Sequence, residues 1–194
     1  MHPKALTGMM TGSSIMFVFA ILWFLLGLSG GRFFPLGMKV AVVVVGLALG
    51  AAIITLAVQA HRISRTAPAP TAEQLDAGRK VGRRFGVING IQWSAVVAVI
   101  ILLNVVRRPD FIAPAIAVIV GLHFLPLAGL FQQPQYYISG IVGCAIGVAG
   151  FLIPDQPARL SAVGLSFGVL LWFTVMTVLW RVYGFIRGQY AAAR

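Results

Sequence analysis

Six long apolar runs, separated by short polar breaks, make up most of this 194-residue chain and limit what it can fold into. Hydrophobic residues are 59% of the sequence and charged residues only 10%. A helix needs ~20 mostly apolar residues to cross a bilayer, and the runs approach that length. A soluble protein does not need six such runs, so the sequence predicts a polytopic membrane protein.

The runs are continuous and do not alternate in polarity, which favours helices over a barrel. In lipid, only helices and closed barrels satisfy every backbone polar group. We therefore predict an all-α bundle of six spans that forms a single transmembrane domain over residues 1–194, with no separate soluble domain. The predicted spans are residues 11–28, 38–58, 87–106, 111–130, 138–153 and 158–182.

The formal net charge of +11 would suit a nucleic-acid partner, but the basic residues lie at the ends of the apolar runs. There they anchor to lipid headgroups and set the orientation of the chain. With both termini on one side, ten Lys and Arg residues fall on that side and five on the other. This excess predicts cytoplasmic termini, and it predicts a lipid bilayer rather than nucleic acid as the partner.

The longest break, residues 59–86, is predicted to be a cytoplasmic loop that contains a short amphipathic helix. Thr71 and Gln74 have the spacing of a capping box, which marks a helix start. The helix is expected to lie in the membrane interface and to end near Phe85. Its basic residues would bind anionic lipid headgroups; they are Arg79, Lys80, Arg83 and Arg84. The simpler interpretation is a charge cluster that only orients the chain.

Glycine spacing predicts which helix faces pack together. Helices in lipid associate by close backbone approach, which glycine permits. The fifth run places four glycines on one helix face, and two other runs carry small-xxx-small pairs. These are Gly140, Gly143, Gly147 and Gly150, then Gly46 with Gly50, and Gly164 with Gly168. The faces are predicted to be helix contacts within the bundle or across a homo-oligomer.

His123 is the sharpest chemical feature, because it lies well inside the fourth apolar run. Ionisable groups at membrane depth are costly, and they usually face a cavity or the interior of a bundle. If the third and fourth spans pair about their short turn, His123 lies level with Ser94 and near Gln92, with Asn89 on the cytoplasmic side. Pro126 tends to free the carbonyl four residues earlier. These five residues form a candidate solute or proton site.

A second interpretation of His123 is a neutral histidine that only joins two helices by a hydrogen bond. A metal site is not expected, since the run holds one histidine and no carboxylate, whereas metals need three or four ligands. No cofactor is predicted, and the single Cys144 is expected to be a packing residue.

The string from Gly164 to Gly168 matches the G-x-S-x-G pattern, but it lies in a helical run, whereas the hydrolase motif needs a strand-to-helix turn. We therefore do not expect an enzyme.

In the outer loops, Asp110 follows Arg108, and Asp155 precedes Arg159. Both are expected to be solvated charges that only shape turns.

Residues 83–140 resemble an uncharacterised family of small bacterial six-span integral membrane proteins. The specific part is a Gly-Leu-His-Phe-x-Pro-Leu-Ala string that begins at Gly121 and includes His123. The resemblance implies a bacterial plasma (inner) membrane, and it implies no activity.

Two functional hypotheses remain open. In the first, the protein passes or binds a small solute or a proton near His123, whose imidazole changes charge near neutrality. In the second, the protein is a non-transporting membrane scaffold or accessory subunit that binds partner helices and anionic lipid. A water-accessible cavity that reaches His123 would distinguish them, because only the first hypothesis requires it.

Overall fold

The computed structural model describes residues 3–30, 34–66, 69 and 71–192, and these residues form helices and connecting turns without a strand. The helices, in chain order, are α1 (Pro3–Gly30), α2 (Leu36–Thr66), α3 (Ala72–Val105), the short 3-10 helix η1 (Pro109–Phe111), α4 (Ile112–Phe131), α5 (Gln135–Phe151) and α6 (Gln156–Ala192). The predicted all-helical class is confirmed.

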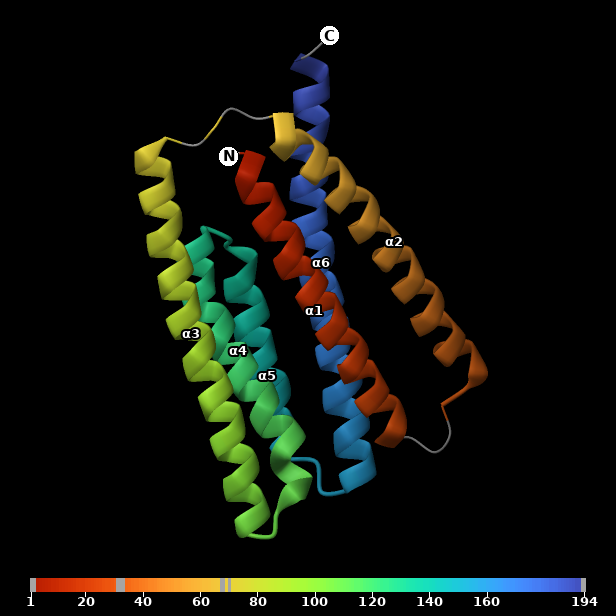
Figure 1. Cartoon of the computed structure of the whole chain (residues 1–194). Coiled ribbons are helices and arrows are strands. Elements are labelled where there is room, and N and C mark those ends of the chain that lie inside the picture. The colour runs from red at the N-terminus through yellow and green to blue at the C-terminus, as the bar shows by residue number, and fades with distance from the viewer. Residues whose placement is uncertain (1–2, 31–33, 67–68, 70, 193–194) are drawn as a thin grey trace.

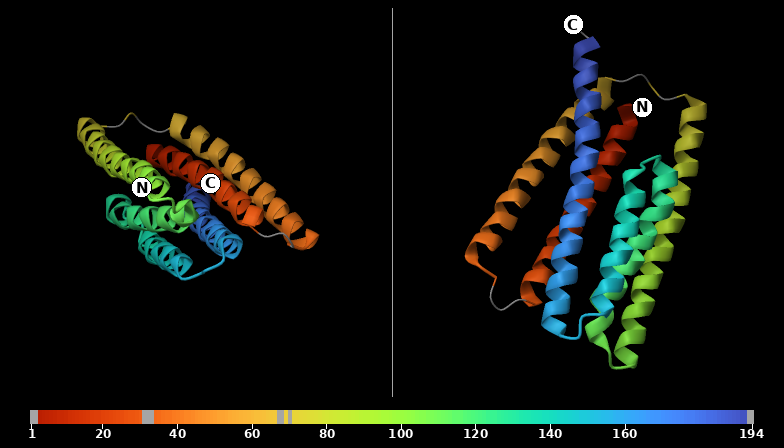
Figure 2. Two further views of the ribbon diagram at one scale, coloured as in Figure 1. Left: turned by 90° about the horizontal axis from the view of Figure 1, so that it is seen from below. Right: turned by 180° about the vertical axis from the view of Figure 1, so that it is seen from behind.

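The six long helices run alternately up and down, so that α1 begins and α6 ends at the same end of the bundle (Figure 1). We call this end the termini end and the other the opposite end. Helix α6 is central: it packs against α1 and α5 and also contacts α2 and α4. Helices α2 and α3 lie at the two flanks (Figure 2).

Five of the helices in the described residues are long and apolar enough to cross a membrane: α1, α2, α3, α4 and α6. Helix α5 is apolar too, but it has only 17 residues. At 1.5 Å per residue it is ~25 Å long, against a hydrocarbon thickness of ~30 Å. The structure thus shows a protein with several apolar helices typical of membrane proteins, and the crossing of α5 stays a prediction.

The predicted interfacial helix is not a separate element. Helix α3 begins at the expected capping box, in which the Gln74 amide donates to Thr71 Oγ1 and the Thr71 amide donates to Gln74 Oε1. It then continues without a break through Gly86 for 34 residues, ~51 Å at 1.5 Å per residue. The change from polar to apolar sequence does not end the helix, because no proline interrupts its backbone hydrogen bonds.

Helix α2 is also longer than predicted, because no proline interrupts its backbone hydrogen bonds. It continues through the polar residues 59–66, which we predicted to be loop. The described non-helical part between α2 and α3 is therefore much shorter than the predicted residues 59–86. Only Ala69 and Thr71 are described there, and the neighbouring residues 67, 68 and 70 lie outside the described part of the chain.

Helices α1 and α6 hold most of the buried core. Trp23 packs on Phe167 with ring centroids 4.7 Å apart, and Phe24 packs on Trp172 at 4.3 Å. In the apolar segment of α6, 61% of the residues are buried, against 6% in α3. Helix α3 is therefore attached along one narrow side, mainly to α4, and its remaining apolar surface is exposed.

Candidate functional site

His123 lies on α4 at its contact with α3. The ring is half-buried, and it lies within hydrogen-bonding reach of the backbone carbonyl of Ile88 in α3. Its Nδ1 atom is buried and makes no hydrogen bond in the described part of the protein. A buried polar nitrogen without a partner is costly in an apolar environment, so this position requires an explanation.

The predicted polar partners lie on α3 at different depths. Asn89 and Gln92 are half-buried, and Ser94 is exposed. Among the described residues, no hydrogen bond joins any of these side chains to His123. The ring of His123 meets α3 at the backbone of Ile88, the residue before Asn89, and not at the level of Ser94 as we expected. The grouping of Asn89 and Gln92 with His123 stays a prediction, and Ser94 faces outward.

Pro126 lies inside α4, and the helix continues through it to Phe131. Proline has no N–H, so the carbonyl of Leu122 lacks its usual helical donor. Leu122 and Pro126 are both exposed on the bundle surface. The freed carbonyl is therefore on the outer side of α4, and the structure does not bring it to the buried side of His123.

The four glycines of α5 lie on its buried face. Gly147 is so close to α4 that an added Cβ would lie 2.7 Å from the carbonyl oxygen of Pro114. At Gly143 it would lie 3.1 Å from the ring of Phe167 in α6. The other two glycines are Gly140, against Gly121 and Leu125, and Gly150, against Val163 and Pro114. This face lies against helices of the same chain.

Glycine also brings α1 and α6 together. An added Cβ at Gly164 would lie 2.5 Å from the Cα of Gly27, and one at Gly168 would lie 2.9 Å from the ring of Phe24. Gly46 and Gly50 on α2 are less crowded, with the nearest atoms at 3.4 Å. Sequence reasoning did not identify Gly27, although the sequence carried a signal, because Gly30 and Gly31 follow it at helical spacing.

The basic residues predicted to bind headgroups are all exposed on the first half of α3, at the termini end. They are Arg79, Lys80, Arg83 and Arg84. Lys80 forms an ion pair of 2.8 Å with Asp76 one turn earlier. Exposed pairs of this kind contribute little to stability, so the cluster remains available to a charged surface.

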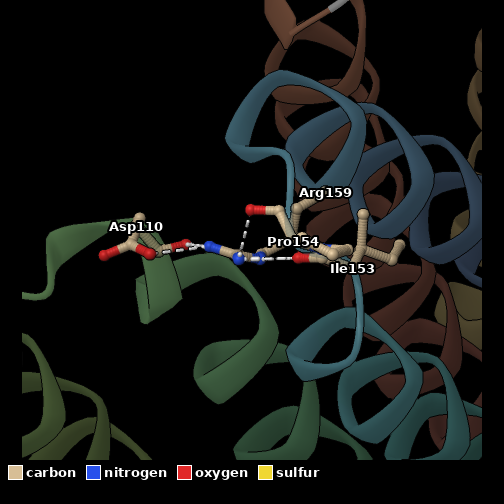
Figure 3. A network of polar contacts seen from close by, with 4 residues as sticks. All are labelled: Asp110, Ile153, Pro154 and Arg159. Atoms are coloured by element: carbon tan, nitrogen blue, oxygen red, sulfur yellow. Dashed lines mark hydrogen bonds and ion pairs between the residues drawn. The ribbon is translucent and has the colours of Figure 1, made fainter.

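At the opposite end, Arg159 is not the solvated charge that we predicted. Its side chain is 4% exposed, and Nη1 lies 2.8 Å from Oδ2 of Asp110 (Figure 3). Every N–H of the guanidinium donates a hydrogen bond: Nε and Nη2 to the carbonyl of Ile153, Nη2 also to Pro154, and Nη1 to the carbonyl and carboxylate of Asp110.

The Arg159 guanidinium also lies 4.2 Å from the ring centre of Phe111, which stacks on Phe151. The network joins η1, the α5–α6 turn and the first turn of α6, and it closes the opposite end of the bundle. One sequence signal was present, since a cation in the first turn of a helix opposes the helix dipole and requires another partner. Asp155 does shape its turn, by accepting from the Ala158 amide at 2.8 Å.

A second polar group, which sequence reasoning missed, lies between α5 and α6 toward the termini end. The hydroxyls of Ser139 and Thr174 are fully buried and lie 2.7 Å apart. Nearby, Oε1 of the buried Gln133 accepts hydrogen bonds from Arg181 and from Gln135. The signal for this group was the unpaired arginine late in the sixth apolar run, together with the glutamine-rich turn.

The described residues contain no group of three or more His, Cys, Asp or Glu side chains close enough to hold an ion. Cys144 is half-buried, with Sγ 3.7 Å from the carbonyl of Val118 in α4.

Comparison with known proteins identifies the family but not an activity. No curated protein and no solved structure matches the chain. A family model described as a family of unknown function (DUF7010) matches residues 3–181. The match includes the first two apolar runs, in which the sequence alone had shown no resemblance. The chain therefore belongs to this family of unknown function.

Proposed function

We propose that this protein is a six-span protein of the bacterial plasma membrane that binds or passes a small solute or a proton between α3 and α4. His123 would be the protonation switch, and Asn89 and Gln92 would be hydrogen-bonding partners for the bound species. The observation that carries the proposal is the buried Nδ1 of His123, which makes no hydrogen bond among the described residues.

The surroundings of His123 support a site with an unmet polar interaction. Structural histidines and amides inside membranes join helices by making hydrogen bonds to each other. Here the half-buried Asn89 and Gln92 lie on the facing helix, and neither bonds to His123. A small molecule with a donor would satisfy Nδ1 and recover the cost of its burial, whereas a proton on Nδ1 would need an acceptor beside it, such as the side-chain oxygen of Asn89 or Gln92.

The weak attachment of α3 supports movement at this position. Only 6% of the residues in its apolar segment are buried, so few contacts oppose a small shift of α3 against α4. Binding sites are commonly formed by the less stable parts of a fold for this reason. A shift at Ile88 would open or close the approach to the ring of His123.

Cysteine accessibility tests this proposal directly. In a Cys144→Ala background, His123→Cys is treated with a small membrane-impermeant thiol reagent from each side of a vesicle. Phe124→Cys is the matched dry control, because Phe124 is 4% exposed, and His61→Cys is the wet control at an exposed position. We expect position 123 to react from one side at least tenfold faster than position 124. Equal rates at the two positions would show the proposal to be wrong.

The same variants give the topology. We propose cytoplasmic termini, which is supported by the ten basic residues that fall on that side against five on the other. His61 lies at the termini end, so His61→Cys should react only with reagent on the cytoplasmic side. Reaction only from outside would reverse the orientation without affecting the proposal for His123.

The second candidate is a membrane scaffold that binds the helices of a partner protein. The exposed apolar surface of α3 favours it, since a largely unburied helix in a bundle can pack against another protein as well as against lipid. This candidate predicts no reaction at position 123 from either side, in a protein that reacts normally at position 61.

A further inference from the structure

An open groove lies between α2 and α6, in the half of the bundle near the termini end. Its volume is about 480 Å³, which is within the ~300–1,000 Å³ typical of ligand sites. The wall is almost wholly apolar, with Ala52 and Leu56 from α2 facing Met176, Leu179 and Trp180 from α6. None of these residues belongs to the site around His123.

The groove continues into a second, more polar hollow of about 400 Å³. Gln59 and Tyr183 line both spaces, and Ile186 and Arg187 complete the second. Moving toward the termini end, the wall therefore changes from aliphatic to amide and phenol, and then to a guanidinium. This order matches the order of chemical groups from the acyl chain to the headgroup of a phospholipid.

The depth of this change matches a membrane interface. Gln59 and Tyr183 come directly after the apolar runs that end at residues 58 and 182. Trp180 and Tyr183 are the residue types that gather at the level of lipid headgroups. The apolar wall thus lies at acyl-chain depth, and Arg187 lies one turn beyond Tyr183, at headgroup level.

Charge selects the headgroup. Neither α2 nor α6 contains an acidic residue. At the termini end, α2 carries Arg62 and Arg65, which do not line either space, and α6 carries Arg181 and Arg187. Arg181 is engaged with Gln133, which leaves Arg187 as the cation that lines the polar hollow. An anionic phosphate complements this surface, whereas a zwitterionic headgroup also places a second cation near Arg187.

The apolar part of the groove is short for a membrane-spanning partner helix. From Ala52 to Gln59, and from Met176 to Tyr183, the walls extend for seven residues, or ~10 Å at 1.5 Å per residue. A partner helix that crosses the hydrocarbon would need a surface of ~30 Å. A flexible acyl chain needs only a short apolar slot beneath its headgroup.

We infer that the α2–α6 groove binds one anionic phospholipid, with an acyl chain along Leu56 and Leu179 and the headgroup phosphate on Arg187, Gln59 and Tyr183. The site is separate from the exposed basic cluster of α3. It is also independent of the proposal for His123, so that either can fail without the other.

Native mass spectrometry of the whole protein, released from nanodiscs of equal parts phosphatidylglycerol and phosphatidylcholine, tests this inference. We expect the wild-type protein to retain one lipid, with phosphatidylglycerol preferred. Arg187→Gln should reduce that preference about fivefold, which is the effect of one arginine at an anionic surface. Arg62→Gln removes the same charge at the same end of the bundle, outside the groove, and should leave the preference unchanged.

A second pair of variants tests the groove itself. Ala52→Phe should fill the apolar slot and abolish retention of either lipid, whereas Ala51→Phe, at the neighbouring exposed position, should retain lipid as the wild type does. The inference is overturned if the wild type retains both lipids equally or neither, if Arg62→Gln acts as strongly as Arg187→Gln, or if Ala52→Phe retains lipid normally. A dimer joined through position 180, found by cross-linking, would overturn it as well.

Discussion

Arg159 and Asp110 form an ion pair of 2.8 Å across 49 residues of sequence, at the end of the bundle opposite the termini. The arginine is buried and the aspartate is only partly exposed. Removing one member of a buried pair leaves the other charge without compensation, and this is far more costly than losing a surface pair. The pair therefore stabilises the only contact between η1 and the first turn of α6 that the hydrogen bonds of the described residues show.

We expect Arg159→Ala to lower the free energy of unfolding by about 3 kcal/mol, because it leaves Asp110 and three carbonyl acceptors without their donor. The measurement is reversible unfolding in mixed micelles, followed by the loss of helical circular dichroism. Lys80→Ala breaks an exposed ion pair of the same length and should cost less than about 0.5 kcal/mol. Similar losses for the two variants would contradict the importance of burial.

Gly164 tests the crossing of α1 and α6. Gly164→Ala adds a Cβ that would lie 2.5 Å from the backbone of Gly27, so the two helices must separate. We expect a loss of about 2 kcal/mol in the same unfolding assay, which is typical of overpacking. In the same helix, Gly184→Ala meets no atom within 4 Å and should be neutral or slightly stabilising. If both variants were neutral, α1 and α6 would not be in close contact at Gly164.

His123→Leu distinguishes a binding site from a structural histidine. In the absence of ligand, the variant removes the buried Nδ1 that makes no hydrogen bond, but it also removes the contact of the ring with the Ile88 carbonyl, so the two effects oppose and the free energy of unfolding should change by less than about 1 kcal/mol. His61→Leu replaces an exposed histidine and should leave the free energy of unfolding unchanged. A loss of more than about 2 kcal/mol in His123→Leu would show that the contact with Ile88 makes the ring a structural link between α3 and α4.

Ser139 and Thr174 test the polar contact between α5 and α6. A double-mutant cycle with Ser139→Ala, Thr174→Val and both together should give a coupling energy of about 0.6 kcal/mol, the average for hydrogen bonds between membrane helices. Each hydroxyl also donates to, or lies near, a carbonyl in its own helix, which limits the loss from either single change. Additive single effects would mean that the two hydroxyls do not interact.

The sequence predicted most of the fold, because long apolar runs have few ways to satisfy their backbone in lipid. Helix starts could also be predicted where a local motif marks them, as Thr71 and Gln74 do for α3. Helix ends were harder to predict. The hydropathy of the sequence changes at residue 86, but the backbone hydrogen bonding of α3 continues through it. A polarity boundary marks a change of environment and does not by itself mark a change of secondary structure.

The candidate site could be predicted only in part, for a related reason. His123 stands out in the sequence, since its chemistry is unusual for its depth. Its neighbours depend on how far α3 slides along α4, and the Ile88 contact differs from the pairing that we inferred from the turn alone. Arg159 was misjudged because its partner Asp110 lies 49 residues away, so that no local spacing connects the two.

Helix α3 is one unbroken rod, and this has a mechanical consequence. Its exposed basic half and the half that carries Asn89 and Gln92 share a single axis, so neither can tilt without the other. If Arg83 and Arg84 bind anionic headgroups, as the sequence predicts, a tilt of the basic half of α3 would also displace Asn89 relative to His123. In the proposed membrane setting, the basic half of α3 and the neighbourhood of His123 are therefore mechanically coupled through one continuous helix.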